Sequence, residues 1–235
     1  MDNHFLKNSL ISHRGIHDNI KTYENTLESF KLAMKKNYII ELDIHLTKDN
    51  QIVVFHDYNT KRITGKDHIV EQSTYKELNN QEIIHIPTLE EVLKLVHGKV
   101  PLLIEIKQNS KVGLLERTLM DILKNYKGEY AIQSFNAMTV YWLKKHYPNI
   151  LRGQLSYHYK KIKMNKLSKF LLKNMIFNPL TKPNFISYKY NELSPRKIKK
   201  YKKKGISLIA WTINNKADFN KYKDIYDNLI CEKFI

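Results

Sequence analysis

Eight short apolar runs alternate along the chain with longer segments that have the apolar spacing of helices. This alternation restricts the fold most, because strands that alternate with helices are typical of a parallel sheet. Eight such strands in 235 residues favour a closed (β/α)8 barrel of the TIM type over an open sheet, with residues 1–235 forming one domain. The expected strands are residues 9–13, 39–44, 102–107, 129–135, 151–156, 185–190, 208–213 and 228–232.

Helices are expected in the segments between these runs. The clearest case is 88–98, where Thr88 is a suitable N-cap, Glu91 follows three residues later, and Gly98 is a helix-stop signal. Together these segments would supply the outer layer of the barrel. The expected helices are residues 24–37, 88–98, 112–126, 136–147, 161–176, 194–204 and 215–223.

One apolar run, residues 51–57, does not fit the regular alternation. It follows the turn-like sequence TKDN, so we expect it to pair antiparallel with the end of the second strand. Residues 58–87 then have weak periodicity and are too long for a simple loop. We therefore predict a small insertion at the mouth of the barrel, with a short helix near the sequence TYKELNN.

Carboxylates occur inside two of the expected strands. Glu41 and Asp43 are two residues apart, so they point to the same side, and Glu105 can approach them from the neighbouring strand. Three converging carboxylates would repel one another unless a cation neutralised them, and oxygen ligands suit Mg²⁺ or Ca²⁺ better than zinc. The alternative for Glu105 is a simple ion pair with Lys107.

Other polar residues also fall at the carboxyl ends of the expected strands, where barrel enzymes have their active sites. The His56–Asp57 pair ends the extra strand, although it could also be a plain turn. His45 is in phase with Asp43, and its alternative role is to line the insertion. The remaining candidates are His13, Arg14, Gly15, Lys107, Gln133, Ser134 and Trp211.

Positive charge is concentrated in one block of a chain whose net charge is +17. Between His158 and Lys204 lie 15 of the 40 Lys and Arg residues but only one acidic residue, Glu192. Such a block indicates an anionic partner, such as a membrane surface, nucleic acid or phosphate, or else a solvated lysine-rich face. We expect no nucleic acid, since no recognised binding motif accompanies the charge.

Within this block, residues 160–175 have helical spacing. Lys163, Lys166, Lys169 and Lys173 would share one face, while the opposite face would carry Met164, Leu167, Leu171 and Met175. An ordinary barrel helix would bury the apolar face. A helix lying on a membrane would instead present basic side chains to anionic lipid.

Cysteine content and the N-terminal sequence bear on location. Cys231 is the only cysteine, so no internal disulfide can form. Residues 1–15 lack the basic and apolar regions of a signal peptide, and no apolar run is long enough to cross a bilayer. We expect a cytoplasmic protein, with peripheral membrane contact if the basic block binds lipid.

The ordered motifs resemble the glycerophosphodiester phosphodiesterase family along nearly the whole chain. These motifs are HRG (13–15), ENT (24–26), ELDIHLTKDNQIVVFHD (41–57), TKRITG (60–65), IPTLEEVL (86–93), IEIK (104–107), QSF (133–135) and WTIN (211–214). The matches in the N-terminal half are the more specific ones.

The resemblance implies a TIM barrel with an insertion after the second strand. It implies that Glu41, Asp43 and Glu105 bind a divalent ion, and that His13 and His56 are the general acid and base. It also implies phosphate binding by Arg14 and Lys107, a substrate contact for Trp211 in the WTIN motif, and a place for Asn25 near the metal or substrate.

The chain departs from the family pattern at its C-terminal end. The family's DGIITDxP is replaced by DNLICEKFI (227–235), so that Cys231–Glu232 stands where Thr-Asp is usual and little sequence is left for an eighth helix. We therefore expect a missing or truncated last helix and an exposed Ile230. Exposed apolar surface often marks an interface, so self-association is expected.

Three functions are consistent with the sequence. The first is metal-dependent hydrolysis of small glycerophosphodiesters to an alcohol and glycerol 3-phosphate. The second is a lysophospholipase D-type reaction at a membrane surface. The third is a catalytically idle barrel that binds anionic partners through its basic block. The nucleophile, either water or a substrate hydroxyl, remains open at this stage.

Overall fold

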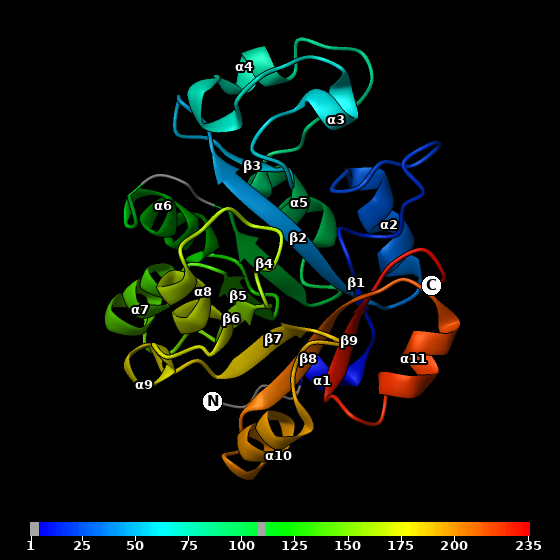
Figure 1. The fold of residues 1–235 in the computed structure, drawn as a ribbon. Helices are drawn as coiled ribbons and strands as arrows, with labels where there is room; N and C mark the ends of the chain where they lie inside the picture. The colour runs from blue at the N-terminus through cyan, green and yellow to red at the C-terminus, as the bar shows by residue number, and fades with distance from the viewer. Residues whose placement is uncertain (1–4, 108–110) are drawn as a thin grey trace.

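The computed structural model describes residues 5–107 and 111–235 of the chain. Within them, eight parallel strands close into a barrel in which β1 pairs with both β2 and β9 (Figure 1). The predicted strands and the barrel are confirmed. The barrel strands are β1 Ile11–Ser12, β2 Ile39–Leu46, β4 Leu102–Ile106, β5 Tyr130–Ser134, β6 Arg152–Ser156, β7 Phe185–Lys189, β8 Ser207–Ile213 and β9 Asn228–Cys231.

Most of the longer helices connect the strands on the outside of the barrel. The capping box predicted at Thr88 is present: its hydroxyl accepts a hydrogen bond from the Glu91 amide, and the Glu91 carboxylate accepts one from the Thr88 amide. The helices are α1 Phe5–Asn8, α2 Leu27–Lys35, α3 Lys61–Thr64, η1 Val70–Gln72, α4 Tyr75–Leu78, α5 Leu89–Val96, α6 Leu114–Leu123, α7 Ala137–His146, α8 Lys166–Lys173, α9 Asn178–Thr181, α10 Pro195–Lys203 and α11 Lys216–Tyr222.

Alternation along β2 separates two cores. Ile40, Leu42 and Ile44 pack with side chains of α2, α5 and α6, so they form the layer between strands and helices. Ile39 instead packs with one apolar residue from each of several other strands, inside the barrel. Since successive side chains of a strand point to opposite faces, Glu41 and Asp43 point inward like Ile39.

The bottom of the barrel is closed by apolar side chains. Ile11, Ile39, Leu103, Ala131, Phe185, Ile209 and Ile230 meet inside it, and Phe5 and Leu6 of α1 pack against them. All of these side chains are buried. The polar side chains of β2 and β4 therefore lie above an apolar floor, at the carboxyl ends of the strands.

The expected insertion after β2 is present. The extra strand β3, Ile52–Val54, pairs antiparallel with the end of β2, as predicted. Residues 58–87 contain α3, η1 and α4, which stand away from the barrel at the top of Figure 1. Their apolar side chains pack with those of β3 and the residue that follows it, in a cluster of Val53, Phe55, Ile63, Val70, Leu78 and Ile86.

The expected exposure of the last strand is wrong. No helix follows β9 in the described residues, yet Ile230 is only 2% exposed because it points into the barrel. On the outer face, Leu229 and Cys231 are covered by Phe219 and Tyr222 of α11 and by Phe234 and Ile235. The apolar patch that was the reason to expect self-association is therefore covered.

The helix expected over residues 161–176 is present but shorter than the sequence pattern predicts. Helix α8 begins at Lys166 and ends at Lys173, so Lys163 and Met164 lie before it. No residue of α8 is buried, and Leu167, expected on the inner face, is 67% exposed. In the described part of the chain, no helix is long and apolar enough to span a bilayer.

Candidate active site

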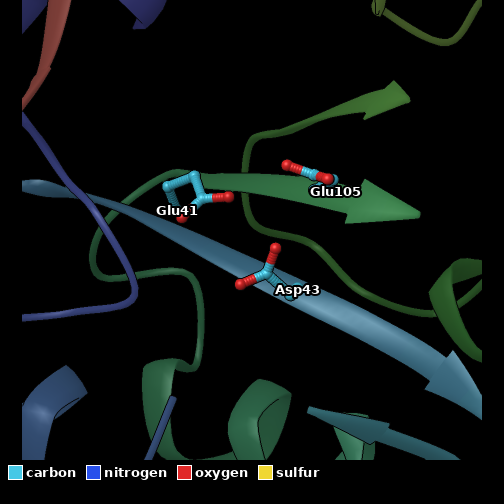
Figure 2. Close-up of side chains that lie close together, drawn as sticks. All are labelled: Glu41, Asp43 and Glu105. Atoms are coloured by element: carbon cyan, nitrogen blue, oxygen red, sulfur yellow. The ribbon is translucent and has the colours of Figure 1, made fainter. Parts of the chain in front are cut away.

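Three carboxylates meet at the carboxyl ends of β2 and β4. Asp43 is the direct register partner of Glu105 on the neighbouring strand, and Glu41 lies two residues before Asp43 on the same face. One carboxylate oxygen from each residue lies within 4.8 Å of the others, and all three residues are buried (Figure 2). The three residues predicted to approach one another therefore do so.

The charges of these carboxylates are strongly coupled. Burial, together with Asp43 and Glu105, raises the pKa of Glu41 well above its ordinary value. Burial also raises the pKa of Glu105, against the lowering effect of Lys107. For Asp43, the cost of burial is outweighed by Lys107, His56 and Arg14, so its pKa is lowered. Three buried carboxylates that disfavour one another's charge offer oxygen ligands that fit a hard divalent cation.

Arg14 is held in the site by an unusual turn after β1. Its backbone has a φ of 56° and that of Gly15 a φ of 79°, both in the left-handed region. A Cβ on Gly15 would lie 2.5 Å from the Ser29 hydroxyl oxygen, so glycine is required there. The turn brings the backbone amide of Arg14 within 3.1 Å of Glu41 Oε2. The side-chain Nε of Arg14 lies 3.4 Å from Asp43 Oδ2.

Lys107 lies on the other side of the same carboxylates. Its Nζ is 2.9 Å from Glu105 Oε1 and 3.4 Å from Asp43 Oδ1. Burial disfavours the ammonium, but these two carboxylates outweigh it and raise the pKa of Lys107. The predicted Glu105–Lys107 pair thus exists together with the carboxylate cluster and is not an alternative to it.

Two histidines lie at the site, and a carboxylate holds each of them. His13 Nδ1 is 2.6 Å from Glu232 Oε2, and His56 Nδ1 is 2.6 Å from Asp57 Oδ1. A carboxylate can only accept, so we assign the proton of each bond to Nδ1, which leaves Nε2 of each ring for proton transfer. Burial lowers the pKa of His13, although Glu232 partly offsets this effect.

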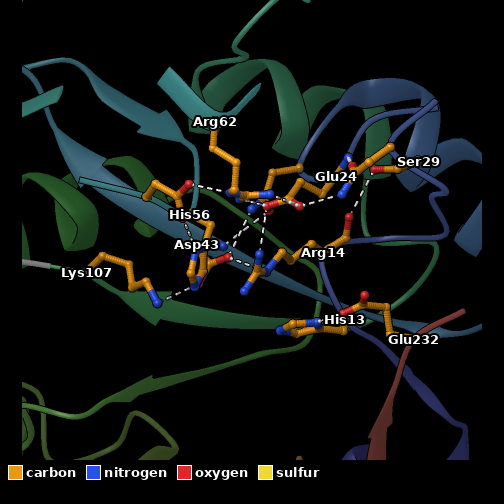
Figure 3. A network of polar contacts seen from close by, with 12 residues as sticks. His13, Arg14, Glu24, Ser29, Asp43, His56, Arg62, Lys107 and Glu232 are labelled. Atoms are coloured by element: carbon orange, nitrogen blue, oxygen red, sulfur yellow. Dashed lines mark hydrogen bonds and ion pairs between the residues drawn. The ribbon is translucent and has the colours of Figure 1, made fainter. Parts of the chain in front are cut away.

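A wider network of ion pairs fixes these groups (Figure 3). Glu24 is buried and accepts hydrogen bonds from Arg14 Nη1 at 2.7 Å and from Arg62 Nη2 at 2.6 Å. Arg62 also donates from Nε to Asp57 Oδ2 at 2.6 Å. Arg62 of the insertion thereby joins the carboxylate that orients His56 to the one that orients Arg14.

Asn25 and His45 support the site from two sides. Asn25 donates from Nδ2 to Asp43 Oδ2 at 2.9 Å. His45 is fully buried, and its Nε2 lies 3.3 Å from the backbone oxygen of His56. Burial lowers the pKa of His45 to about 4, so a neutral ring packs against the loop that carries His56.

Trp211 belongs to an aromatic group on the opposite side of the mouth. Its ring makes edge contacts with Phe135 and Tyr157, at centroid distances of 5.6 and 5.9 Å. The buried Nε1 of Trp211 forms no hydrogen bond with any residue that the structure describes. The other two candidates have internal roles: Gln133 accepts a hydrogen bond from Ser187, and Ser134 donates one to the backbone of Ile106.

A largely apolar cavity of about 450 Å³ adjoins the carboxylates. Glu105 and Lys107 form part of its wall, and the volume is within the range of small-molecule sites. Most other side chains around it are apolar or aromatic, and several come from the segment between β6 and β7. They include Tyr58, Phe135, Met138, Tyr159, Met164, Leu172 and Phe177.

Sequence reasoning missed three supporting residues, Glu24, Arg62 and Glu232. The first two stand inside the motifs ENT and TKRITG, so their places were marked although their contacts were not. Glu232 was noted only as a departure that affects the integrity of the barrel. The structure corrects this interpretation, since Glu232 contacts His13 directly.

A closed parallel barrel with charged side chains gathered at the carboxyl ends of its strands is the architecture of a TIM-barrel enzyme. The chain belongs to the glycerophosphoryl diester phosphodiesterase family, whose model matches residues 13–229. It is therefore a phosphoric diester hydrolase of the glycerophosphodiester phosphodiesterase type.

Individual proteins agree with this family assignment. The Bacillus subtilis protein YhdW is 33% identical over 221 residues, covering 88% of this chain and 86% of that protein. A glycerophosphodiester phosphodiesterase of Caldanaerobacter subterraneus subsp. tengcongensis is 29% identical over 232 residues, covering 92% and 90%. An Oleispira antarctica phosphodiesterase, solved with the product sn-glycerol-3-phosphate, has the same fold, with a TM-score of 0.80, 20% identity and coverage of 95% and 92%.

Proposed function

We propose that the chain hydrolyses small glycerophosphodiesters to an alcohol and glycerol 3-phosphate at the site between β2 and β4. The observation that carries this proposal is the buried cluster of Glu41, Asp43 and Glu105 with two carboxylate-held histidines beside it. An idle barrel would not need this complete set of buried charges, which is costly unless the charges are paired.

A divalent ion, Mg²⁺ or Ca²⁺, would be held by Glu41, Asp43 and Glu105. When bound, it would offset the charge of the phosphodiester and of the developing transition state. Arg14 and Lys107 flank the same carboxylates with short contacts, and they would bind the phosphate oxygens. Trp211, with its free indole N–H, would contact the substrate from the opposite side.

His13 and His56 would divide the proton transfers. One imidazole accepts through Nε2 the proton of the nucleophile, either water or a substrate hydroxyl, and the other protonates the leaving alcohol oxygen. Attack by water gives glycerol 3-phosphate directly, whereas attack by a substrate hydroxyl gives a cyclic phosphate that a water molecule must then open. Burial lowers the pKa of His13, which favours the neutral ring that can accept a proton. Glu232 and Asp57 hold the two rings by Nδ1 and so keep each Nε2 available.

Metal dependence is tested with glycerophosphocholine as substrate. We expect EDTA to abolish hydrolysis and added Mg²⁺ or Ca²⁺ to restore it. Glu41→Ala and Asp43→Ala should be inactive with either ion, whereas Glu90→Ala, which removes an exposed acid on α5, should behave as wild type. Full activity of either ligand variant in excess EDTA would contradict the assignment.

The apolar cavity favours a second candidate, a lysophospholipase D-type reaction. A lysophospholipid has the same phosphodiester and, in addition, an acyl chain. The cavity is lined by Glu105 and Lys107 together with apolar side chains such as Met138, Met164 and Leu172. It therefore offers apolar surface next to the proposed phosphate site. A deacylated substrate would leave this surface unused.

Comparing two substrates separates the candidates. Met164→Asp places a charge in the cavity wall, while Leu114→Asp, at an exposed residue of α6 outside both the cavity and residues 157–184, is the matched control. If lysophospholipids are substrates, Met164→Asp should lower activity on lysophosphatidylcholine by at least about tenfold, since a buried unpaired charge is strongly disfavoured. Activity on glycerophosphocholine should persist in both variants. Equal loss on both substrates would count against the second candidate.

A further inference from the structure

The segment between β6 and β7, residues 157–184, carries a high positive charge. It contains seven lysines and no acidic residue. Among the described residues, no carboxylate lies within 4.0 Å of these lysines, and Lys160, Lys161, Lys163 and Lys166 are exposed. Their charge is therefore uncompensated by the protein and faces solvent.

The same segment concentrates exposed apolar side chains. Of the 14 large hydrophobic residues exposed in the described chain, six lie within 162–180. Leu167 is 67% and Phe170 53% exposed, and they are three residues apart, so they share one side of α8. The other four are Ile162, Ile176, Phe177 and Leu180.

Hydrogen bonds fix this segment at the mouth of the barrel. Ser156, the last residue of β6, donates from Oγ to the backbone oxygen of Leu172 at 2.9 Å. Tyr188 of β7 donates from its hydroxyl to the backbone oxygen of Lys173 at 3.0 Å. Met164, Leu172 and Phe177 line the cavity next to the carboxylates, so one side of the segment borders the active site.

We propose that residues 157–184 form a docking surface for an anionic lipid bilayer, which places the mouth of the barrel at the membrane. Basic residues interleaved with exposed aliphatic and aromatic residues on a short amphipathic helix have the chemistry of an interfacial segment. A nucleic acid would use the lysines but would leave Leu167 and Phe170 without a function.

Helix α10 offers an internal control for charge alone. Lys199, Lys200, Lys202 and Lys203 are exposed on it, in a helix that is even more basic. No large hydrophobic residue within Pro195–Lys203 is exposed. Charge without apolar side chains should therefore not place this face on a membrane.

The test uses co-sedimentation of the full chain with vesicles of phosphatidylcholine alone, or of phosphatidylcholine mixed with phosphatidylglycerol. Wild type should bind the anionic vesicles in a salt-sensitive way and the neutral ones weakly. Replacing Lys160, Lys161, Lys163 and Lys166 with Glu should weaken binding at least about 100-fold. The matched replacement of Lys199, Lys200, Lys202 and Lys203 with Glu should change it by less than about threefold.

A second variant tests the apolar contribution. Leu167→Asn with Phe170→Asn should weaken binding to anionic vesicles about tenfold without changing the salt dependence, because it removes only apolar contacts. All three variants should hydrolyse glycerophosphocholine as wild type does, since none of these residues lines the site. This keeps docking separate from catalysis.

Several outcomes would overturn the proposal. The first is no binding of wild type to anionic vesicles. The second is equal loss in the variant of Lys160, Lys161, Lys163 and Lys166 and in the matched α10 variant, which would show a response to net charge only. The third is an unchanged affinity of the Leu167/Phe170 variant, which would indicate a general polyanion surface. The fourth is a dimer that this variant abolishes in the absence of lipid.

Discussion

Two sides of the barrel mouth use charge in opposite ways. At β1, β2 and β4, Arg14 and Lys107 each form ion pairs with two buried carboxylates. In residues 157–184, the lysines face solvent without a carboxylate partner among the described residues. Buried charges must be paired, and the pairing holds the side chains in the fixed positions that catalysis needs. Exposed and unpaired charges remain available to bind a partner.

The largest expected effect concerns the paired side. His13→Ala and His56→Ala should each lower kcat for glycerophosphocholine by roughly 10²- to 10⁴-fold, the usual range for a general acid or base. Substrate affinity should change much less. Steady-state kinetics with saturating metal measures both quantities. If only one variant is impaired, the division of proton transfers between two histidines is wrong.

The next effect is on stability and concerns Glu24. Burial opposes its charge, but hydrogen bonds from Arg62 and the charge of Arg14 lower its pKa to about 2. The unfolded chain binds this proton more tightly, so the stabilisation is present above pH 4.5 and is lost as the pH falls toward 2. We expect the free energy of unfolding of wild type to exceed that of Glu24→Gln by up to about 3 kcal/mol at pH 7. This difference should become smaller as the pH falls.

Urea unfolding of the two proteins at several pH values measures this difference. The control is Glu90→Gln, which removes an exposed acid and should track wild type at every pH. If the difference in the free energy of unfolding did not depend on pH, the packing of the Glu24 side chain, and not its charge, would account for it.

A smaller kinetic effect is expected at Glu232. Glu232→Gln should lower kcat by roughly 10- to 100-fold, the usual range for a residue that orients a catalytic group. The negative charge of Glu232 raises the pKa of His13, so its loss should shift the limb of the pH–rate profile assigned to His13 to lower pH. Glu232→Asp should recover part of the rate. An unchanged profile would indicate a purely structural role.

The smallest expected effect is on the unpaired side. Leu167→Ala should change the free energy of unfolding by less than about 0.5 kcal/mol, because the side chain is mostly exposed. Leu42→Ala in the outer core should cost about 2–5 kcal/mol. A large loss at Leu167 would mean that α8 is scaffold, and thermal or urea unfolding distinguishes these outcomes.

The local sequence pattern was enough to predict the strands, most of the helices and the carboxylate cluster. Alternation in β2 predicts that Glu41 and Asp43 share a face, and the strand order of a barrel brings Glu105 beside them. Both follow from periodicity, which is a property of neighbouring residues. The motifs around His13 and His56 likewise marked residues that the structure gathers at one site.

Contacts between distant segments were decided only by the tertiary structure. Glu232 and His13 are 219 residues apart, and Arg62 reaches Glu24 across 38 residues, so no local pattern pairs them. The burial of Ile230 depends on which face of β9 turns into the closed barrel. The exposure of Leu167 depends on α8 having no layer packed over it. Apolar spacing shows that a helix has two faces, but only the surrounding fold determines which of them is covered.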